Sequence, residues 1–232
     1  MRLLRVPGVY GPGSDSRLLA AAIPGQVRLT DRVLDVFTGS GVQAITAARA
    51  GAAEVLAVDV SRRAMLSVAL NSRLNGVRIE ARRGCMFEPV AGMRFDLILA
   101  NPPFVPGEEG DAGPRGDSRA WEAGPDGRKF LDPFLLEVSG YLTPGGRVLL
   151  VQSSISDTDR TLEALCEAGM TASVVSRQEH PLGPVTAPRA EALEARGVLR
   201  PGQRTEETVV ICGAIGAPAA VGTEPAVSMA TG

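Results

Sequence analysis

The segment Asn101-Pro102-Pro103-Phe104 contains the residue types that most directly suggest chemistry. Two consecutive prolines fix the backbone and carry no N–H donors, so the neighbouring carbonyl groups are free to point into a cleft. The Asn101 amide oxygen and the Pro102 carbonyl oxygen can together accept both hydrogens of a planar NH2 group, and the Phe104 ring can cover its face. The segment predicts a site that holds a trigonal nitrogen. The structural alternative is a proline-rich strand exit that only directs the chain.

A glycine-rich turn and a later aspartate indicate a second ligand. The sequence DVFTGSG (residues 35–41) ends a run of apolar residues, and Gly39 and Gly41 let the backbone turn sharply and approach a ligand closely. By itself such a turn is typical of any tight strand–helix connection. Asp59, however, ends the next apolar run, where a carboxylate can accept both hydroxyl hydrogens of a ribose. Asp59 could instead only cap the following helix, but Ser61 is already available for that role.

These features predict a cofactor that contains a nucleoside, either a nicotinamide dinucleotide or S-adenosylmethionine. Gly39-x-Gly41-x-x-Ala44 loosely matches a dinucleotide fingerprint. A dinucleotide needs a second mononucleotide-binding half, however, and no second glycine-rich turn follows a strand later in the chain. Asp35 suits an ammonium group such as that of a methionine moiety. The sequence therefore favours S-adenosylmethionine.

Short apolar runs alternate with helical patterns and would position these residues. The alternation implies parallel strands with right-handed crossovers, and hence a doubly wound α/β sheet. In the segments that connect the strands and helices, we expect an exposed loop over 106–127, a turn at 144–146 and a loop containing 181–184. The expected strands cover residues 32–37, 54–60, 77–81, 95–100, 147–152, 171–176 and 208–215. The expected helices run from a cap at Ser14 or Asp15 to 23, over 42–50, from the Ser61 cap to 74, and over 130–141, 157–168 and 189–196.

Composition excludes several classes of protein. The 232 residues suffice for one globular domain, and a net charge of −2 gives no general basic surface for nucleic acid. Cys85, Cys166 and Cys212 are far apart in the sequence, which predicts neither a disulfide framework nor a metal site and fits a reducing cytoplasm. The N-terminal segment breaks at Pro7 before any apolar stretch, and no run of about eighteen apolar residues follows, so we expect no signal peptide and no membrane partner.

With these motifs in place, the chain resembles the class I S-adenosylmethionine-dependent methyltransferases, and among them the HemK/PrmC-type protein glutamine methyltransferases. The likeness runs from about Val9 to Gly213 and rests on VYGPGSDSRLL (9–19), DVFTGSG (35–41), AVDVS (57–61), GCMFEP (84–89) and ANPPFVP (100–106). The opening is most similar to the shorter branch of the family, which lacks a separate N-terminal release-factor-binding domain and includes the eukaryotic and archaeal enzymes.

The resemblance implies a Rossmann-like, mostly parallel seven-stranded sheet with an antiparallel last strand. The expected divisions of the chain are an N-terminal segment with a lid helix (1–25), the methyltransferase domain (26–216) and a tail (217–232), which we expect to be disordered because it has almost no bulky side chains. In such enzymes Asp35 and Gly39 would hold the methionine end of the cofactor, Asp59 its ribose, and the turn at Cys85 and Met86 its adenine. The implied catalytic residues are Asn101, Pro102 and Phe104, and the implied cofactor-binding residues are Ser16, Asp35, Phe37, Gly39, Gly41, Asp59, Cys85, Met86 and Asn101.

Two positions depart from the family pattern. Phe37 replaces the usual first glycine of the loop, which narrows the space beside the methionine moiety. Cys85 stands where the family has an aspartate that accepts a hydrogen bond from the adenine amino group, and a thiol is a poor acceptor. We expect the Met86 backbone and apolar packing to hold the ring instead.

The resulting hypothesis is methyl transfer to a side-chain nitrogen of a protein, most plausibly a glutamine amide in a release-factor-like substrate. The alternatives are an exocyclic amine of RNA or DNA, a small molecule or peptide, and a degenerate relative that binds without turnover. His180, the single histidine, is expected to be a loop or structural residue, because this chemistry needs no base. Tyr10, Trp121 and Glu122 could line the same cleft.

The strand over 77–81 is expected at an edge of the sheet. Relatives in the short branch are stabilised at this edge by a small zinc-binding activator protein. The resemblance therefore implies a similar partner for this chain. Nucleic acid ranks behind protein as a partner, because of the net charge and the absence of an added RNA-binding module.

Overall fold

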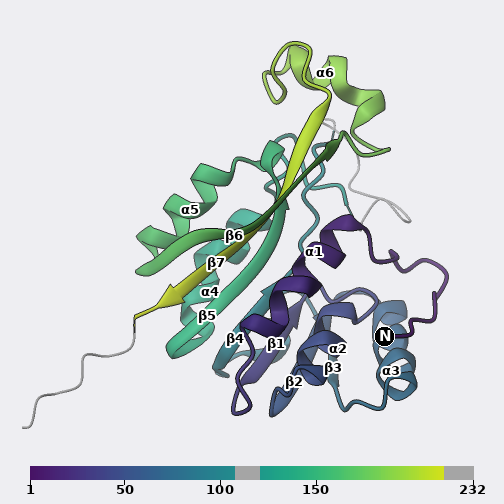
Figure 1. Cartoon of the computed structure of the whole chain (residues 1–232), viewed down its shortest axis with the longest axis vertical. Helices are drawn as coiled ribbons and strands as arrows, with labels where there is room; N and C mark the ends of the chain where they lie inside the picture. Colours follow the sequence, from purple (N-terminus) through teal and green to yellow (C-terminus); the bar gives the residue numbers. More distant parts are fainter. Residues whose placement is uncertain (108–120, 217–232) are drawn as a thin grey trace, which may run out of the picture.

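A computed structural model describes residues 1–107 and 121–216. Its centre is a seven-stranded sheet in the order β3-β2-β1-β4-β5-β7-β6 (Figure 1). Strand β7 runs antiparallel to both β5 and β6, whereas the other neighbouring strands are parallel. The expected mostly parallel sheet with an antiparallel last strand is confirmed. The strands are β1 (Arg32–Val36), β2 (Glu54–Asp59), β3 (Glu80–Arg83), β4 (Phe95–Ala100), β5 (Leu142–Ser153), β6 (Met170–Pro181) and β7 (Thr205–Ile215).

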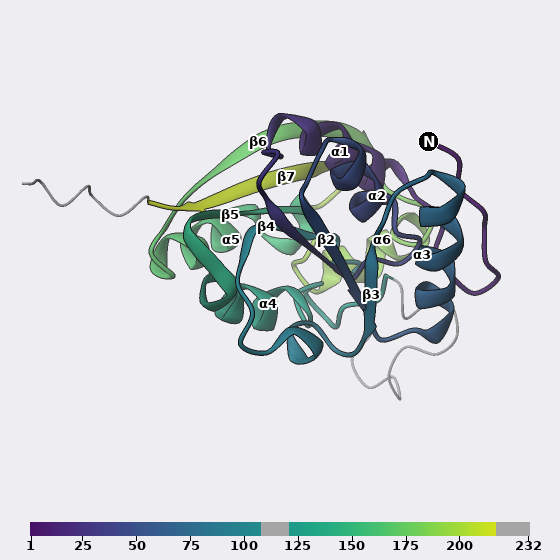
Figure 2. The ribbon, with the colours of Figure 1, turned by 90° about the horizontal axis from the view of Figure 1, so that it is seen from below.

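Helices cover both faces of the sheet, as a doubly wound fold requires. One buried cluster joins the sheet to α1, α2 and α3, and a second joins it to α4 and α5 (Figure 2). Neighbouring residues of β1 belong to opposite clusters, since Val33 packs on the first face and Leu34 on the second. This explains why the strands read as continuous apolar runs. The helices are α1 (Ser14–Ala22), α2 (Val42–Arg49), α3 (Arg62–Leu74), α4 (Leu131–Val138), α5 (Thr158–Glu167) and α6 (Ala190–Ala195).

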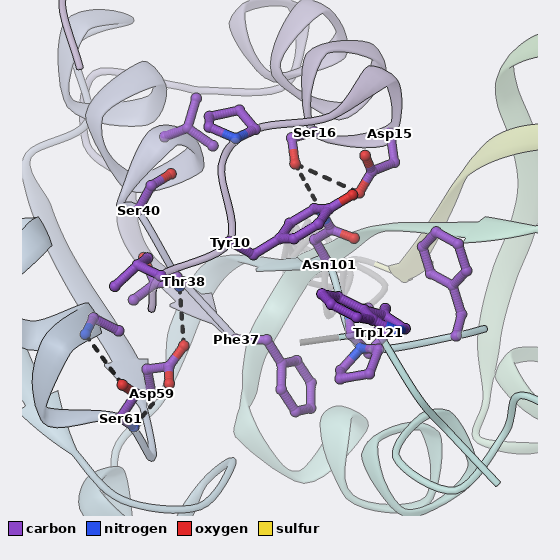
Figure 3. A pocket seen from close by; sticks show the side chains of 18 of the residues that line it. Tyr10, Asp15, Ser16, Phe37, Thr38, Ser40, Asp59, Ser61, Asn101 and Trp121 are labelled. Atoms are coloured by element: carbon purple, nitrogen blue, oxygen red, sulfur yellow. Dashed lines mark hydrogen bonds between the residues drawn. The ribbon is translucent and has the colours of Figure 1, made fainter. Parts of the chain in front are cut away.

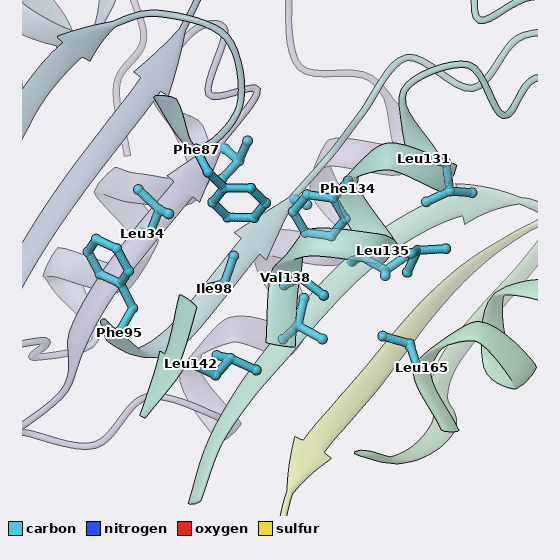
Figure 4. Close-up of a cluster of buried hydrophobic side chains, with 14 of the residues drawn as sticks. Leu34, Phe87, Phe95, Ile98, Leu131, Phe134, Leu135, Val138, Leu142 and Leu165 are labelled. Atoms are coloured by element: carbon cyan, nitrogen blue, oxygen red, sulfur yellow. The ribbon is translucent and has the colours of Figure 1, made fainter. Parts of the chain in front are cut away.

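Aromatic side chains fill the core between the sheet and α4. Phe87 stacks on Phe134 with ring centroids 5.5 Å apart and on Tyr141 at 4.3 Å (Figure 4). Phe87 and Phe134 are at most 1% exposed, and burial of such a side chain contributes about 1.5–3 kcal/mol. Phe87 follows the Cys85-Met86 turn directly, so this packing anchors one wall of the site described below.

Local signals explain where α3 begins and ends. The Ser61 hydroxyl accepts a hydrogen bond from the Ala64 N–H at 3.3 Å, which confirms the expected cap. The helix ends at Leu74, and Gly76 then adopts a φ of 66°, a left-handed conformation that favours glycine. The expected cap of α1 is wrong, because its N-cap is Gly13 and no side chain accepts a hydrogen bond there.

Several strand boundaries differ from expectation, among them the start of β7, which lies at Thr205 and not at 208. Strand β3 lies at 80–83 and not at 77–81, because its pairing with β2 begins at Glu80. Strand β5 begins at Leu142, and the expected turn at 144–146 forms an irregularity within its pairing with β4. Strand β6 extends to Pro181, so His180 lies in a strand that pairs with β7 and not in a loop.

Parts of two expectations fall outside the described residues. Of the expected loop over 106–127, only 106–107 and 121–127 are described, and the expected tail over 217–232 is not. Within the described ranges, no helix has the length and hydropathy needed to cross a membrane. The same ranges contain no group of three or more His, Cys, Asp or Glu side chains arranged to hold a metal ion.

Candidate active site

A single cavity of about 1490 Å³ runs along the carboxyl ends of the strands. Ligands of α/β sheets bind at this edge, and a site for one small molecule typically occupies about 300–1,000 Å³. The cavity therefore has room for two ligands. Its walls come from the N-terminal segment, the ends of β1, β2, β4 and β5, the turn after β3, and the ends of β6 and β7 that lie at this edge.

The half of the cavity over β1 and β2 contains a carboxylate that organises the glycine-rich turn. Asp59 accepts hydrogen bonds from the Gly39 N–H at 3.0 Å and from the Ser61 N–H at 2.9 Å, one on each carboxylate oxygen (Figure 3). Burial raises the pKa of Asp59, and these backbone donors partly oppose the rise. Each oxygen keeps a lone pair, so Asp59 can still accept from hydroxyl groups in the cavity.

Gly39 and Gly41 serve the turn in different ways. Both have a positive φ, 50° and 83°, which favours glycine. A Cβ atom on Gly41 would also come within 3.2 Å of Val68 Cγ2 on α3, so a side chain there would push the helix away. Gly39 lines the cavity, whereas Gly41 lies behind it at the start of α2.

Asp35 does not line the cavity. Its side chain is 1% exposed, and one carboxylate oxygen accepts hydrogen bonds from the Thr38 hydroxyl at 2.5 Å and from the Ala44 N–H at 3.0 Å. The other oxygen is buried and has no partner among the described residues. Burial raises the pKa of Asp35 to about 7, with a smaller contribution from the charge on Asp59. The residue thus lies beneath the turn with one acceptor unused.

Phe37 occupies a conformation that suits the glycine of the family pattern. Its φ is 63°, and such a left-handed conformation costs a non-glycine residue about 1–3 kcal/mol. The ring lies 6.4 Å from that of Phe130 and 6.1 Å from that of Phe134, so aromatic packing offsets part of this cost. Phe37 lines the cavity, as expected.

Cys85 and Met86 form the wall that follows β3. Both line the cavity, and the Cys85 N–H donates to the Glu88 carboxylate at 3.1 Å. Burial raises the pKa of the Cys85 thiol, and the charges of Glu88 and Glu137 raise it further. The side chain therefore stays a neutral thiol and a weak acceptor.

The Asn101 side chain has a defined orientation. Its amide nitrogen donates to Asp15 Oδ2 at 2.8 Å and to Ser16 Oγ at 3.0 Å, both on the first turn of α1 (Figure 3). Because both N–H bonds are engaged, the amide oxygen is the atom left to accept a hydrogen bond. No described residue donates to it. Pro102 and Phe104 line the same part of the cavity, so the three expected catalytic residues lie together.

Sequence reasoning missed Asp15 as a site residue. The acidic residue near a helix start was interpreted as a cap, and its contact with Asn101 joins residues 86 positions apart. No local pattern signals such a contact. Ser16, which was expected to contact the cofactor, lines the cavity, and its side chain is 4% exposed.

The half of the cavity beyond Asn101 is assembled from distant segments. Tyr10 contacts Trp121, with ring centroids 5.9 Å apart at 58°, and both line the cavity. His180 bonds through Nε2 to the Thr208 hydroxyl at 2.7 Å, and Nδ1 lies 2.8 Å from the Pro181 carbonyl. Since the carbonyl only accepts, Nδ1 carries the proton. Glu122 is not in the cavity wall but pairs with Arg189 at 3.1 Å.

Comparisons with known proteins point to methyltransferases. The family described as "Methyltransferase small domain" matches residues 1–113. A Methanocaldococcus jannaschii protein named "Putative protein N5-glutamine methyltransferase" is 35% identical over 175 residues, which cover 75% of this chain and 87% of that protein. The release factor glutamine methyltransferase of Geobacter sulfurreducens is 30% identical over 70% of this chain, which spans only 59% of that longer relative.

Solved structures show the same fold. A chain of the E. cuniculi Mtq2–Trm112 complex, described as responsible for methylation of the translation termination factor eRF1, superposes with a TM-score of 0.63. The two chains are 20% identical, and the match covers 90% of this chain and 99% of that one.

Proposed function

The chain belongs to the HemK/PrmC-type protein glutamine methyltransferases, and we propose from this that it methylates the amide nitrogen of a glutamine side chain in a protein, with S-adenosylmethionine as the methyl donor. The observation that carries the proposal is the oriented Asn101 amide, whose oxygen faces a cavity large enough for both cofactor and acceptor. A translation release factor is the proposed substrate, by similarity to relatives named for that reaction.

The residues of the cofactor half fit S-adenosylmethionine. Asp59 has acceptor capacity left for ribose hydroxyl groups, and Asp35 would support the methionine end from beneath the turn, through its bonds to Thr38 and Ala44. Met86 and the Cys85 turn would pack against adenine, and Ser16 would contact the cofactor beside Asn101. When bound, S-adenosylmethionine supplies a methyl carbon that its sulfonium sulfur makes electrophilic.

Asn101 and Pro102 would hold the nucleophile. A glutamine amide nitrogen is a weak nucleophile because its lone pair is delocalised. The Asn101 amide oxygen and the Pro102 carbonyl oxygen would each accept a hydrogen bond from one N–H group of this nitrogen. The Phe104 ring would cover the face of the amide. Holding the nitrogen in line with the methyl carbon makes the encounter effectively unimolecular. The alkylated amide is strongly acidic and loses its extra proton without a dedicated base, so His180 can remain structural.

Labelled methyl transfer tests the function. The purified chain is incubated with methyl-labelled S-adenosylmethionine and a purified translation release factor, and the label is located by peptide mass spectrometry. We expect one methyl group on one glutamine side chain. A parallel reaction uses total cellular protein before and after nuclease treatment. Label that disappears with nuclease and persists after protease would instead establish a nucleic-acid substrate and contradict the proposal.

A small activator protein at the edge of the sheet is the proposed partner. Strand β3 lies at the edge of the sheet, with β2 as its neighbour. The similar E. cuniculi structure is a two-protein complex. Expression of the chain alone tests the partner: a stable, active monomer in size-exclusion chromatography would contradict it, whereas an insoluble or inactive chain rescued by a co-expressed partner would support it.

A further inference from the structure

The chain on either side of residues 108–120 is held as a pair of adjacent segments. The Val105 N–H donates to the Trp121 carbonyl at 2.7 Å, and the Ala123 N–H donates back to the Val105 carbonyl at 2.9 Å. The Gly107 N–H then bonds to the Gly124 carbonyl at 2.8 Å. The outgoing segment thus follows Phe104 directly, and the returning segment begins with Trp121. Both aromatic side chains line the acceptor half of the cavity.

Two arginines bridge these segments from outside. Arg189 donates through one guanidinium nitrogen to the Pro106 carbonyl at 3.3 Å and through the other to the Glu122 carboxylate at 3.1 Å. Arg196 donates to the Gly107 carbonyl at 2.8 Å and, through its other nitrogen, to the Pro125 carbonyl. Each planar guanidinium therefore joins the outgoing segment to the returning one, a geometry that a lysine cannot reproduce.

Both arginines belong to a small structural unit of residues 182–204, which lies between β6 and β7 and carries α6 (Figure 1). The unit has its own apolar cluster, in which Leu182, Leu193 and Leu199 are at most 7% exposed. Arg189 and Arg196 extend from this cluster to the paired segments. They therefore connect the buried cluster to the wall of the cavity.

We propose that Arg189 and Arg196 are positioning residues for the acceptor, which they align by fixing Trp121 against Tyr10 and Phe104 beside Asn101. Neither arginine is in the cavity wall, so both act through the segments they join. The half of the cavity over β1 and β2 is lined by other residues, so we expect cofactor binding not to depend on the two arginines. The inference rests on the proposed function insofar as the acceptor is a protein.

Trp121 fluorescence reports directly on the position of this wall of the cavity, because Trp121 is the only tryptophan in the sequence. In Arg189→Gln and Arg196→Gln we expect its emission to shift to longer wavelength and its quenching by acrylamide to increase. With a purified release factor, KM for the acceptor should rise about tenfold while kcat changes less than about twofold, because the wall that binds the acceptor moves whereas Asn101, which would hold the reacting nitrogen, keeps its contacts with Asp15 and Ser16. The Kd for S-adenosylmethionine should stay unchanged.

Two further variants separate positioning from general stability. Arg204→Gln is the matched control, because Arg204 bonds to Glu194 within the same unit. Arg189→Lys keeps a charge beside Glu122 but loses the planar bridge, so its fluorescence should lie between those of wild type and Arg189→Gln. Unchanged Trp121 fluorescence and acceptor KM in the Arg→Gln variants would overturn the inference, as would an equal loss of cofactor and acceptor affinity.

Failure of the proposed function is distinguishable from failure of this inference. If the wild-type chain methylates no release factor, the proposed substrate is wrong. The Trp121 spectra then still decide whether the arginines set the wall of the cavity, because they require no methyl transfer.

Discussion

The two halves of the cavity are built in different ways. The half proposed for the cofactor comes from consecutive strand–turn–helix units, in which Gly39, Asp59 and Cys85 each lie at or shortly after the end of a strand. The half proposed for the acceptor joins Tyr10, Asn101 and the paired segments 105–107 and 121–124 through contacts between residues far apart in the sequence. The difference teaches that the half proposed for the cofactor depends on local backbone geometry, whereas the half proposed for the acceptor depends on tertiary contacts.

The largest expected effect comes from breaking the acceptor half at Asn101. Asn101→Ala removes the amide oxygen that would hold the acceptor, and loss of one such group costs up to ~10³-fold in kcat. The Kd for S-adenosylmethionine, measured by calorimetry, should change little. Near-normal methyl transfer by this variant would reject the role of Asn101.

The opposite pattern, a loss of cofactor affinity, is expected when Asp59 is replaced. Asp59→Ala removes the carboxylate proposed to accept the ribose hydroxyl hydrogens and releases the Gly39 and Ser61 N–H groups. Since each bond to a charged group contributes about 1.5–3 kcal/mol, we expect cofactor Kd to rise at least about tenfold. Glu54→Ala, an exposed change at the start of β2, is the control. An unchanged Kd in Asp59→Ala would separate this residue from the cofactor.

A smaller change, a gain in cofactor affinity, is expected at Cys85, where the chain departs from its family. Cys85→Asp would supply a strong acceptor for the adenine amino group, but repulsion from Glu88 offsets part of the gain. We expect cofactor Kd to fall about fivefold, a net change of about 1 kcal/mol. Cys166→Asp on the exposed surface is the matched control. A weaker Kd in Cys85→Asp would indicate that packing alone holds the ring.

A pH effect is expected from the buried carboxyl of Asp35. Its pKa in the folded chain is about 7, above the ordinary 3.8, so between these values the folded chain keeps a proton that the unfolded chain has lost. The free energy of unfolding should therefore fall as pH rises from about 4 to about 7. Thermal melts should show a decrease of Tm over this range that Asp35→Asn reduces; the pKa of Asp59, which burial also raises, contributes the remainder. Identical pH profiles for wild type and Asp35→Asn would contradict this assignment.

Much of the fold followed from local patterns. The alternation of apolar runs with helical periodicity predicted all seven strands and the helices between them, and the Ser61 cap was located correctly. Errors arose where pairing overrides local signals: the register with β2 shifts β3, and pairing with β7 extends β6 through His180. In the site, Asp35 was recognised by its position before the turn, but only the structure shows that it lies beneath the cavity wall.

The sequence by itself determined the order of strands and helices, the glycine-rich turn and the Asn-Pro-Pro corner, because each depends on residues adjacent in the chain. The tertiary structure alone decided which way the Asn101 amide faces, through Asp15 and Ser16 on a distant helix. It also decided that Arg189 and Arg196 fasten the acceptor wall. The physical reason is that a side-chain hydrogen bond between remote segments has no periodicity and leaves no pattern in the sequence.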